Sequence, residues 1–224
     1  MIELSKMAAP YRVWPGLLVL IGPLLCGYAS AQAQPFSADL VSRQGDATAP
    51  AGRLSVLDDK VRLETPELAD GFFLIDGAKP AAYFVRPAMR IYMDARQSSR
   101  LTRWFVPVDP DDPCRQWQTM ARLAGVADQA DWHCERIGED VIGGRRVTAY
   151  RAILAADEQV LGWIDPEYRF PLRIKMQDGA VITVENIRDR PPSAPPLEIP
   201  QGFRKFDPEA LIERIKQSDV WVTP

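Results

Sequence analysis

Short runs of alternating apolar and polar residues, separated by turn signals, occupy most of the chain from residue 34 onward. Successive side chains of a β-strand point to opposite faces, so this period of two predicts strands with one buried face. Asp58-Asp59 and Asp178-Gly179 each separate two such runs and predict tight hairpin turns. The runs cover residues 36–43, 53–57, 60–64, 72–76, 81–86, 89–94, 132–137, 146–153, 159–165, 168–176 and 180–187. The chain is therefore predicted to be mostly β, with antiparallel strands.

Two segments have helical spacing instead. Between residues 114 and 126, apolar side chains such as Trp117 and Met120 recur at helical intervals. Near the C-terminus, Asp207 is a favourable N-cap and Pro208 suits the first helical position, so a short helix is predicted to end near Lys216. These two helices place the chain in the α+β class.

The first 33 residues have the order of a secretory signal peptide. Lys6 and Arg12 precede an apolar run over residues 14–25, and small residues follow at 29–33. Proline and glycine interrupt the run, which is short for a bilayer span. We expect residues 1–33 to be removed after Ala31 or Ala33, leaving residues 34–224 as one domain that does not span a membrane. A retained membrane anchor is the alternative.

The charge balance is mild. The chain has 224 residues and a formal net charge of -3 at pH 7, with no long basic or acidic block. Proteins that bind nucleic acids carry a positive patch, so no nucleic-acid partner is predicted. After removal of the leader, the remaining length suits a single domain of ordinary size.

The cysteines point to an oxidising compartment. Cys26 lies in the leader, and Leu25 directly before it does not fit a lipoprotein signal. Cys114 and Cys134 form an even pair, which predicts a disulfide in an exported protein. A metal site that also uses His133 is the alternative, but side chains adjacent on a strand point to opposite faces. The disulfide is favoured, and no metal site is predicted.

The sequence lacks a recognisable catalytic constellation. His133 is the only histidine, and no Gly-x-Ser-x-Gly motif is present. The acidic turn at residues 109–112 lacks the glycine and the distal glutamate of an EF-hand, so we interpret it as a cap for the following helix. Gly143-Gly144 lacks the strand-to-helix setting of a phosphate loop and is interpreted as a hairpin turn. We predict neither enzymatic activity nor a cofactor.

Apolar side chains on alternating strand faces are the remaining candidates for a binding site. In a closed sandwich they would form the core, and in an open curved sheet the same face would line a groove. Methionine adapts to variable apolar ligands, and a buried acyl chain gains about 0.8 kcal/mol per methylene. The candidate groove residues are Phe84, Met89, Ile91, Met93, Leu172, Ile174 and Met176.

The second half of the chain carries four short motifs in order. They are Gly143-Gly144-Arg145, Gly162-Trp163-Ile164-Asp165, Phe170-Pro171-Leu172-Arg173-Ile174 and Ile199-Pro200-Gln201-Gly202-Phe203-Arg204-Lys205. With the leader and the helix-bearing interruption, this order resembles the superfamily of periplasmic outer-membrane lipoprotein carriers and receptors (LolA/LolB-like), above all its uncharacterised relatives. The likeness covers residues 36–216 in order of elements and residues 143–205 in motif.

The resemblance implies an antiparallel open half-barrel with helices across its concave face. In the carriers, that hollow takes up acyl chains of lipoproteins. We therefore expect a periplasmic, non-enzymatic protein that shields a lipid or lipoprotein acyl chain in an apolar groove. The alternative is an envelope protein-interaction or sensing module on the same fold. The helix segment with Cys114 and the proline-rich connector at residues 189–196 depart from the carriers.

Overall fold

The computed structural model describes residues 34–95, 99–126, 132–155, 158–189 and 196–217. Contacts divide the chain into residues 1–31 and residues 32–224. The predicted signal peptide lies outside the described residues, so its removal stays a prediction. Within the described part of the chain, no helix combines the length and the apolar character that a membrane crossing requires.

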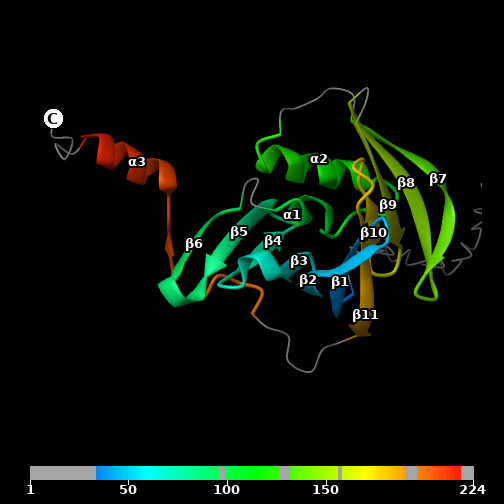
Figure 1. Ribbon diagram of the computed structural model, residues 1–224, viewed down its shortest axis with the longest axis horizontal. Coiled ribbons are helices and arrows are strands. Elements are labelled where there is room, and N and C mark those ends of the chain that lie inside the picture. The colour runs from blue at the N-terminus through cyan, green and yellow to red at the C-terminus, as the bar shows by residue number, and fades with distance from the viewer. Residues whose placement is uncertain (1–33, 96–98, 127–131, 156–157, 190–195, 218–224) are drawn as a thin grey trace, which may run out of the picture. The chain divides into compact units, whose positions relative to one another are not determined.

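Twelve strands of the described residues form one sheet (Figure 1). Its order is β12-β6-β5-β4-β3-β2-β1-β11-β10-β9-β8-β7. All neighbouring strands are antiparallel except β12 and β6, which are parallel. The end strands β12 and β7 do not pair with each other, so the sheet is open. The predictions of a mostly β protein and an open sheet are confirmed, whereas the half-barrel shape with helices across its concave face stays a prediction.

The bounds of most strands follow the predicted alternation. They are β1 Phe36–Gln44, β2 Ala47–Leu57, β3 Lys60–Glu64, β4 Phe72–Asp76, β5 Ala81–Arg86, β6 Ile91–Asp94, β7 His133–Ile142, β8 Arg145–Ala155, β9 Glu158–Asp165, β10 Phe170–Lys175, β11 Val181–Asp189 and β12 Arg204–Lys205. The helices are α1 Leu101–Trp104, α2 Pro113–Leu123 and α3 Pro208–Gln217, with short 3-10 turns η1 Pro66–Leu68 and η2 Pro87–Met89. Helices α2 and α3 were predicted, and α1 was not.

Three predicted strands differ in extent, and β12 was not predicted. β2 begins at Ala47, six residues before the predicted run 53–57, β7 continues to Ile142, five residues beyond the predicted run 132–137, and β6 begins later than predicted. The alternation of residues 89–94 predicts a strand from Met89, but the structure starts β6 at Ile91. Pro87 opens the turn η2, and Arg90 then adopts a left-handed conformation with φ 52°. Proline fixes its own φ and lacks a main-chain donor, so the chain turns here before it can join the sheet.

The main core lies on one face of the sheet, beneath α1 and α2. Side chains from these helices fill it, and Trp104 and Trp117 are fully buried. The Trp117 indole Nε1 donates a hydrogen bond to the Trp104 carbonyl oxygen at 3.1 Å, which satisfies the polar atom of a buried ring. The main core also includes Phe36, Leu40, Leu54, Leu63, Phe73, Phe105, Met120, Ile164, Tyr168 and Phe170.

The predicted disulfide is present. Cys114, in the first turn of α2, is bonded to Cys134 on β7, with 5.5 Å between the two Cα atoms. The Asp112 side chain accepts a hydrogen bond from the Arg115 amide at 3.3 Å, which caps the start of α2. The acidic turn therefore serves the helix as predicted, and the disulfide ties that helix end to the edge of the sheet.

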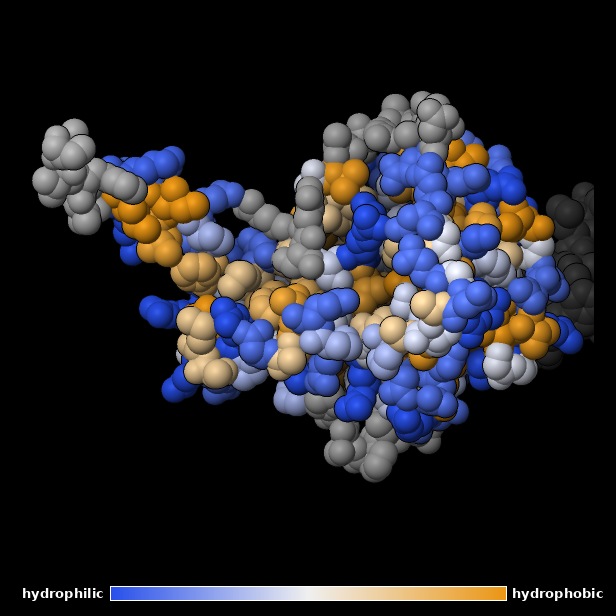
Figure 2. Space-filling view, in the orientation of Figure 1, coloured by the Kyte–Doolittle hydropathy of each residue, from blue (hydrophilic) through white to orange (hydrophobic). Residues whose placement is uncertain are grey.

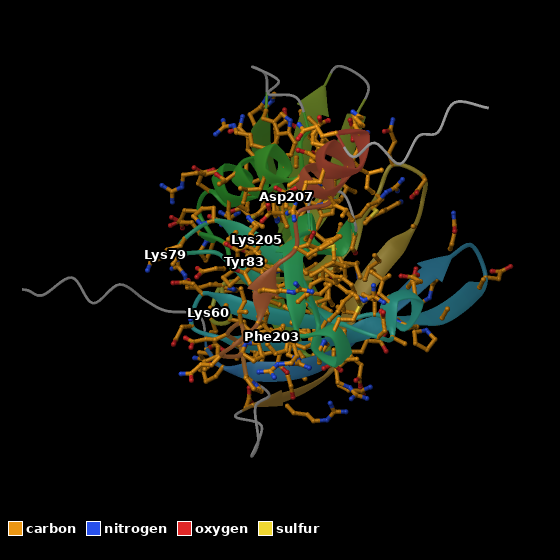
Figure 3. All side chains as sticks on the ribbon, turned by 90° about the vertical axis from the view of Figure 1, so that its left-hand side faces the viewer. Lys60, Lys79, Tyr83, Phe203, Lys205 and Asp207 are labelled. Atoms are coloured by element: carbon orange, nitrogen blue, oxygen red, sulfur yellow. A yellow bond between two sulfur atoms is a disulfide. The ribbon has the colours of Figure 1, made fainter. Side chains whose placement is uncertain are left out.

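A second, smaller cluster lies on the opposite face of β4 and β5, which we call the outer face. Phe72, Leu74 and Val85 are buried there, and Ile199 and Phe203 of the C-terminal segment pack against them. Figure 3 shows Phe203 and Lys205 following one another along this segment. Beyond it, the helix α3 has no buried residue. Figure 2 shows a hydrophobic patch on α3, whose large exposed apolar side chains are Leu211, Ile212 and Ile215.

Candidate functional site

The structure distributes the seven candidate groove residues over several environments. Phe84, Leu172, Ile174 and Met176 belong to the main core, and Met93 packs against it. Ile91 is also buried, whereas Met89 is 54% exposed on η2. Five of the seven are therefore buried and Met93 is partly buried, so these positions do not form the continuous open groove expected from the strand pattern alone.

Trp117 explains why this groove is filled. Its indole lies over β9, where a Cβ atom placed on Gly162 would be only 2.4 Å from the Trp117 ring and 3.3 Å from Ile174. Leu172 and Ile174, on the neighbouring strand β10, have no exposed surface. A bulky ring thus occupies the space above the strands that a ligand would need. The structure favours the core interpretation of these residues over the groove interpretation.

A smaller hollow remains at the edge of the main core, beside α1. It has a volume of about 450 Å³ and includes Trp104, Val160 and Met176 in its wall. Arg100 and Arg103 lie at the same hollow, and Arg103 stacks over the Trp104 ring at 4.9 Å. Burial lowers the pKa of Arg103. Met176 is the candidate residue that lines this hollow.

A larger hollow lies on the outer face of β1, β2 and β3. Its volume is about 780 Å³, within the range of ligand sites. We call it the outer cleft. Its lining residues are Asp39, Leu40, Val41, Pro50, Gly52, Arg53, Arg62, Glu64, Thr65, Pro66, Ala69, Asp70, Gly71, Phe72, Pro87 and Ala88. Met89 directly follows Ala88 on η2, so the exposed candidate residue lies next to this cleft in the chain.

The outer cleft exists because β3 stops before β2 does. Pro66 opens the turn η1 directly after β3, and proline cannot continue a sheet ladder. The pairing of β2 with β3 ends at Arg53 and Glu64, while β2 continues beside β1 to Ala47. Gly52 passes close to the end of β3, since a Cβ there would be 2.5 Å from the Glu64 carbonyl oxygen. The space that more of β3 would have filled is left open.

Charged side chains are paired around the rim of the cleft. Arg62 lies 3.4 Å above the centre of the Phe72 ring and donates to Glu64 at 2.8 Å. Its side chain is only 16% exposed, so the pair is partly desolvated and held in one place. Arg86 similarly pairs with Asp70. Opposite charges are balanced, which favours a ligand of low net charge.

Two polar atoms beside the cleft lack partners. Thr65 is 6% exposed and lines the cleft, and its Oγ1 has no hydrogen-bond partner among the described residues. Arg86 directly precedes Pro87 of the cleft lining, and its buried Nε also has no hydrogen-bond partner within the described parts of the chain. Buried polar groups are normally hydrogen-bonded, because leaving one unsatisfied costs about 1–3 kcal/mol. Both atoms can donate, so they suit a ligand that supplies carbonyl oxygens.

Sequence reasoning missed the outer cleft. Its charged residues alternate with core residues along β2 and β3, so they look like an ordinary solvated face. The available signal was the pair of prolines, Pro66 and Pro87, each directly after a strand run. These prolines end β3 and β5 at neighbouring places and leave the hollow between their turns.

The remaining sequence candidates do not assemble into a chemical site. Among the described residues, no group of three or more histidine, cysteine, aspartate or glutamate side chains could hold a metal ion. His133 lies 3.8 Å from Glu135 on the exposed edge strand β7.

Comparison with known proteins identifies related folds. No protein-family model and no curated protein sequence matches the chain. The solved structure of PNGF-II matches 83% of this chain and 34% of its own, with 7% identity and a TM-score of 0.50. The MucA/MucB complex of Pseudomonas aeruginosa matches 75% of this chain and 56% of its own, with 12% identity and a TM-score of 0.37.

A lipoprotein-sorting structure is also among the matches. The putative outer membrane lipoprotein-sorting protein domain from Vibrio parahaemolyticus matches 72% of this chain and 87% of its own, with 10% identity and a TM-score of 0.31. This chain spans about a third of PNGF-II and just over half of the matched chain in the MucA/MucB complex. At these identities the likeness is one of fold alone, and the assignment to the lipoprotein-carrier superfamily stays a prediction.

Proposed function

We propose that this protein is a non-enzymatic binding protein of the cell envelope that holds an extended segment of a partner protein in the outer cleft. The observation that carries the proposal is the contrast between the two faces of the sheet. The predicted groove is filled by Trp104 and Trp117, whereas the outer cleft is an open hollow of about 780 Å³. A binding site needs space that the protein does not fill itself.

The lining of the outer cleft suits a peptide. Its floor includes Phe72 and three prolines, which offer apolar surface, and its rim carries paired charges of both signs. Thr65 Oγ1 and Arg86 Nε supply donors without partners among the described residues. A peptide presents carbonyl oxygens at regular intervals together with side chains of mixed polarity, so it matches all three features.

A random peptide library displayed on phage tests this function with the purified protein. We expect enriched peptides that bind, by fluorescence anisotropy, at least about tenfold more weakly to Ala69→Trp, because an indole at this exposed cleft residue occupies the hollow. The matched control Ala210→Trp, on α3, should bind normally. Failure to enrich any binding peptide, or equal binding by Ala69→Trp, would contradict the proposal.

A second candidate function retains the acyl-chain hypothesis. The hollow of about 450 Å³ beside α1 has an apolar wall of Trp104, Val160 and Met176. Its polar lining includes Arg103 and Glu158, together with Arg100, which pairs with Asp178 at 3.1 Å. These features suit the end of a fatty acyl chain with an acidic head group. We expect mass spectrometry of organic extracts to detect bound fatty acid, and a fluorescent fatty acid to bind less tightly to Val160→Trp. Lipid-free protein that does not bind the fluorescent probe would contradict this function.

The location in the envelope is part of the proposal. The charged, apolar and small-residue order of residues 1–33 supports export to the periplasm. The Cys114–Cys134 disulfide supports an oxidising compartment. N-terminal sequencing of the protein from a periplasmic extract should begin at Gln32 or Gln34, and a chain that still begins at Met1 would contradict export with cleavage.

A further inference from the structure

One part of β2 has a strand on only one side. Residues 53–57 of β2 pair with β3, and residues 47–50 and Gly52 pair with β1. Among the described residues, no strand pairs with residues 47–52 on the side that faces away from β1. We call residues 47–52 the β2 overhang. Pro50 and Gly52 of this overhang line the outer cleft.

The alternation of the β1–β2 ladder shows which main-chain groups face the open side. Gln44 and Ala47 flank the two-residue turn at Gly45-Asp46, so they form a hydrogen-bonded pair. The next pair, Arg43 and Thr48, is then of the non-hydrogen-bonded kind, and its main-chain groups point away from the partner strand. The N–H and C=O of Thr48 therefore face the open edge.

Pro50 fits this arrangement. Pro50 is paired with Val41 and lies two residues after Thr48 on β2. Because the two kinds of pair alternate along the ladder, the main-chain groups of Pro50 also face the open edge. Proline lacks an N–H and is tolerated in a sheet where that donor would point away from the ladder. Within residues 47–50, the open edge thus offers one donor, from Thr48, and two acceptors, from Thr48 and Pro50. The exposed side chains of residues 47–50 leave it accessible.

We propose that the outer cleft binds its partner segment as an added β-strand that pairs with the β2 overhang. The added strand would take the position beside β2 that β3 occupies up to Glu64. The inference rests on the proposed function and specifies how the partner segment is bound. The incoming main chain would accept from Thr48 N–H and donate to the carbonyls of Thr48 and Pro50. Further along the segment, Thr65 Oγ1 and Arg86 Nε–H are the nearby donors for its carbonyl oxygens.

Strand addition also determines what side chains the partner carries. Alternate side chains of the added strand face the floor of the cleft, where Phe72, Pro66 and Pro87 lie, and the others face away. The partner segment is therefore an extended stretch of about four to six residues with small or apolar side chains at alternate positions, since six residues span roughly 20 Å. Proline at a paired position of the segment is excluded, because it has no donor.

The substitution Thr48→Pro tests the mode. It removes the one donor that residues 47–50 present at the open edge, and the native β1–β2 ladder does not use that donor. We expect peptides selected on the wild-type protein to bind Thr48→Pro about tenfold more weakly, whereas Thr48→Ala, which keeps the N–H, should bind normally. Hydrogen exchange should show the Thr48 amide becoming protected when the peptide binds, and thermal unfolding of all variants confirms that the sheet is intact.

The outcomes separate the mode from the function. Equal binding of the peptide by Thr48→Pro and wild type, with binding still lost in Ala69→Trp, would overturn strand addition and leave the cleft as the binding site. Normal binding by both variants would overturn the proposed function as well. If Thr48→Pro failed to fold, lack of Thr48 amide protection in the wild-type complex would by itself overturn the inference.

Discussion

The Trp117 ring lies directly over Gly162, and a Cβ atom at Gly162 would be 2.4 Å from it. This contact joins α2 to β9 and closes the space in which an apolar ligand was expected. Because the ring is fully buried and its Nε1 is bonded to the Trp104 carbonyl oxygen, it cannot move without loss of both packing and a hydrogen bond.

Gly162→Ala should therefore destabilise the protein. The added methyl group collides with a rigid aromatic ring, and overpacking of this kind typically costs about 1–3 kcal/mol. Urea unfolding followed by tryptophan fluorescence measures the change. The double variant Gly162→Ala/Trp117→Leu should be less destabilised than the sum of the two single variants, because the smaller side chain makes room for the methyl group. Additive effects would contradict a direct contact.

Loss of the disulfide should lower stability under oxidising conditions. Cys114 and Cys134 are 20 residues apart, and closing a loop of this size contributes about 3 kcal/mol in the chain-entropy model. Cys114→Ser is expected to melt at a lower temperature than wild type in oxidising buffer. In reducing buffer the two proteins should melt at similar temperatures. If Cys114→Ser melted below wild type by the same amount in both buffers, loss of the disulfide would not be the cause of its lower melting temperature.

Asp165 should be critical for stability although it lies outside the outer cleft. Its carboxylate is 1% exposed and accepts hydrogen bonds from Arg145 Nε at 2.5 Å and from the amides of Glu167 and Tyr168 at 2.8 and 3.0 Å. Asp165→Ala should cost about 1–3 kcal/mol, since the amides of Glu167 and Tyr168 lose their acceptor, whereas the partly exposed Arg145 keeps its ion pair with Glu167 at 2.6 Å.

An exposed pair provides the control for Asp165. Glu135 and Arg151 form a surface ion pair at 3.2 Å, and Glu135→Ala should cost less than about 1 kcal/mol. Guanidinium unfolding of both variants measures the difference. Comparable losses of unfolding free energy in the two variants would mean that the burial of Asp165 does not determine how much its contacts stabilise the protein.

Alkaline pH should weaken the protein through Tyr168. Burial, followed by the hydrogen bond that Tyr168 donates to Asp189, raises the pKa of Tyr168 to about 12 from the ordinary value of 10.0. A pKa raised in the folded state contributes stability that is fully present below pH 10.0 and is lost as the pH rises towards about 12. Wild-type stability should therefore fall over this interval.

Tyr168→Phe removes this dependence, although it also removes the hydrogen bond to Asp189. Its stability should be lower than that of wild type at neutral pH and should fall less between pH 10.0 and about 12. Urea midpoints at several alkaline pH values measure both effects. Burial also raises the pKa of Tyr150, which remains in both proteins and accounts for part of the residual fall. Parallel curves for the two proteins would contradict the shift at Tyr168.

Thr65→Val tests the unsatisfied hydroxyl of the outer cleft. Replacing a buried donor that has no partner among the described residues with a methyl group of similar shape should leave stability unchanged or raise it by up to about 1 kcal/mol. Differential scanning calorimetry measures this change. A loss of more than about 1 kcal/mol would show that the hydroxyl has a structural partner, and Thr102→Val, which removes the bonded hydroxyl at the start of α1, is the destabilised control.

The elements of the fold were largely predictable because their signals are local. The hairpin turn at Asp58-Asp59 appears where the dipeptide predicts it, and Asp58 adopts the left-handed conformation with φ 53°. Alternation identified the strands, and Asp112 was correctly interpreted as part of a helix cap. The start of β6 was missed because Pro87 begins the turn η2, which keeps Met89 and Arg90 out of the strand.

The candidate site was predicted less well. Alternation assigns Leu172 and Ile174 to one face but does not say what covers that face. Trp117 covers it from a helix about 55 residues away in the chain, and no periodicity within either segment contains that information. The outer cleft was missed for the same reason, since it depends on the different lengths of β2 and β3 and on turns that follow two separate strands.

The sequence by itself determined most of the residues that form strands, where the chain turns, and which two cysteines could pair. These properties depend on side-chain period, backbone preference and residue type within a few positions. Only the tertiary structure decided that tryptophan rings fill most of the space over one sheet face and that the other face carries an open cleft. The physical reason is that space is filled or left empty by segments that meet only after folding, and the volume between them is a property of no single segment.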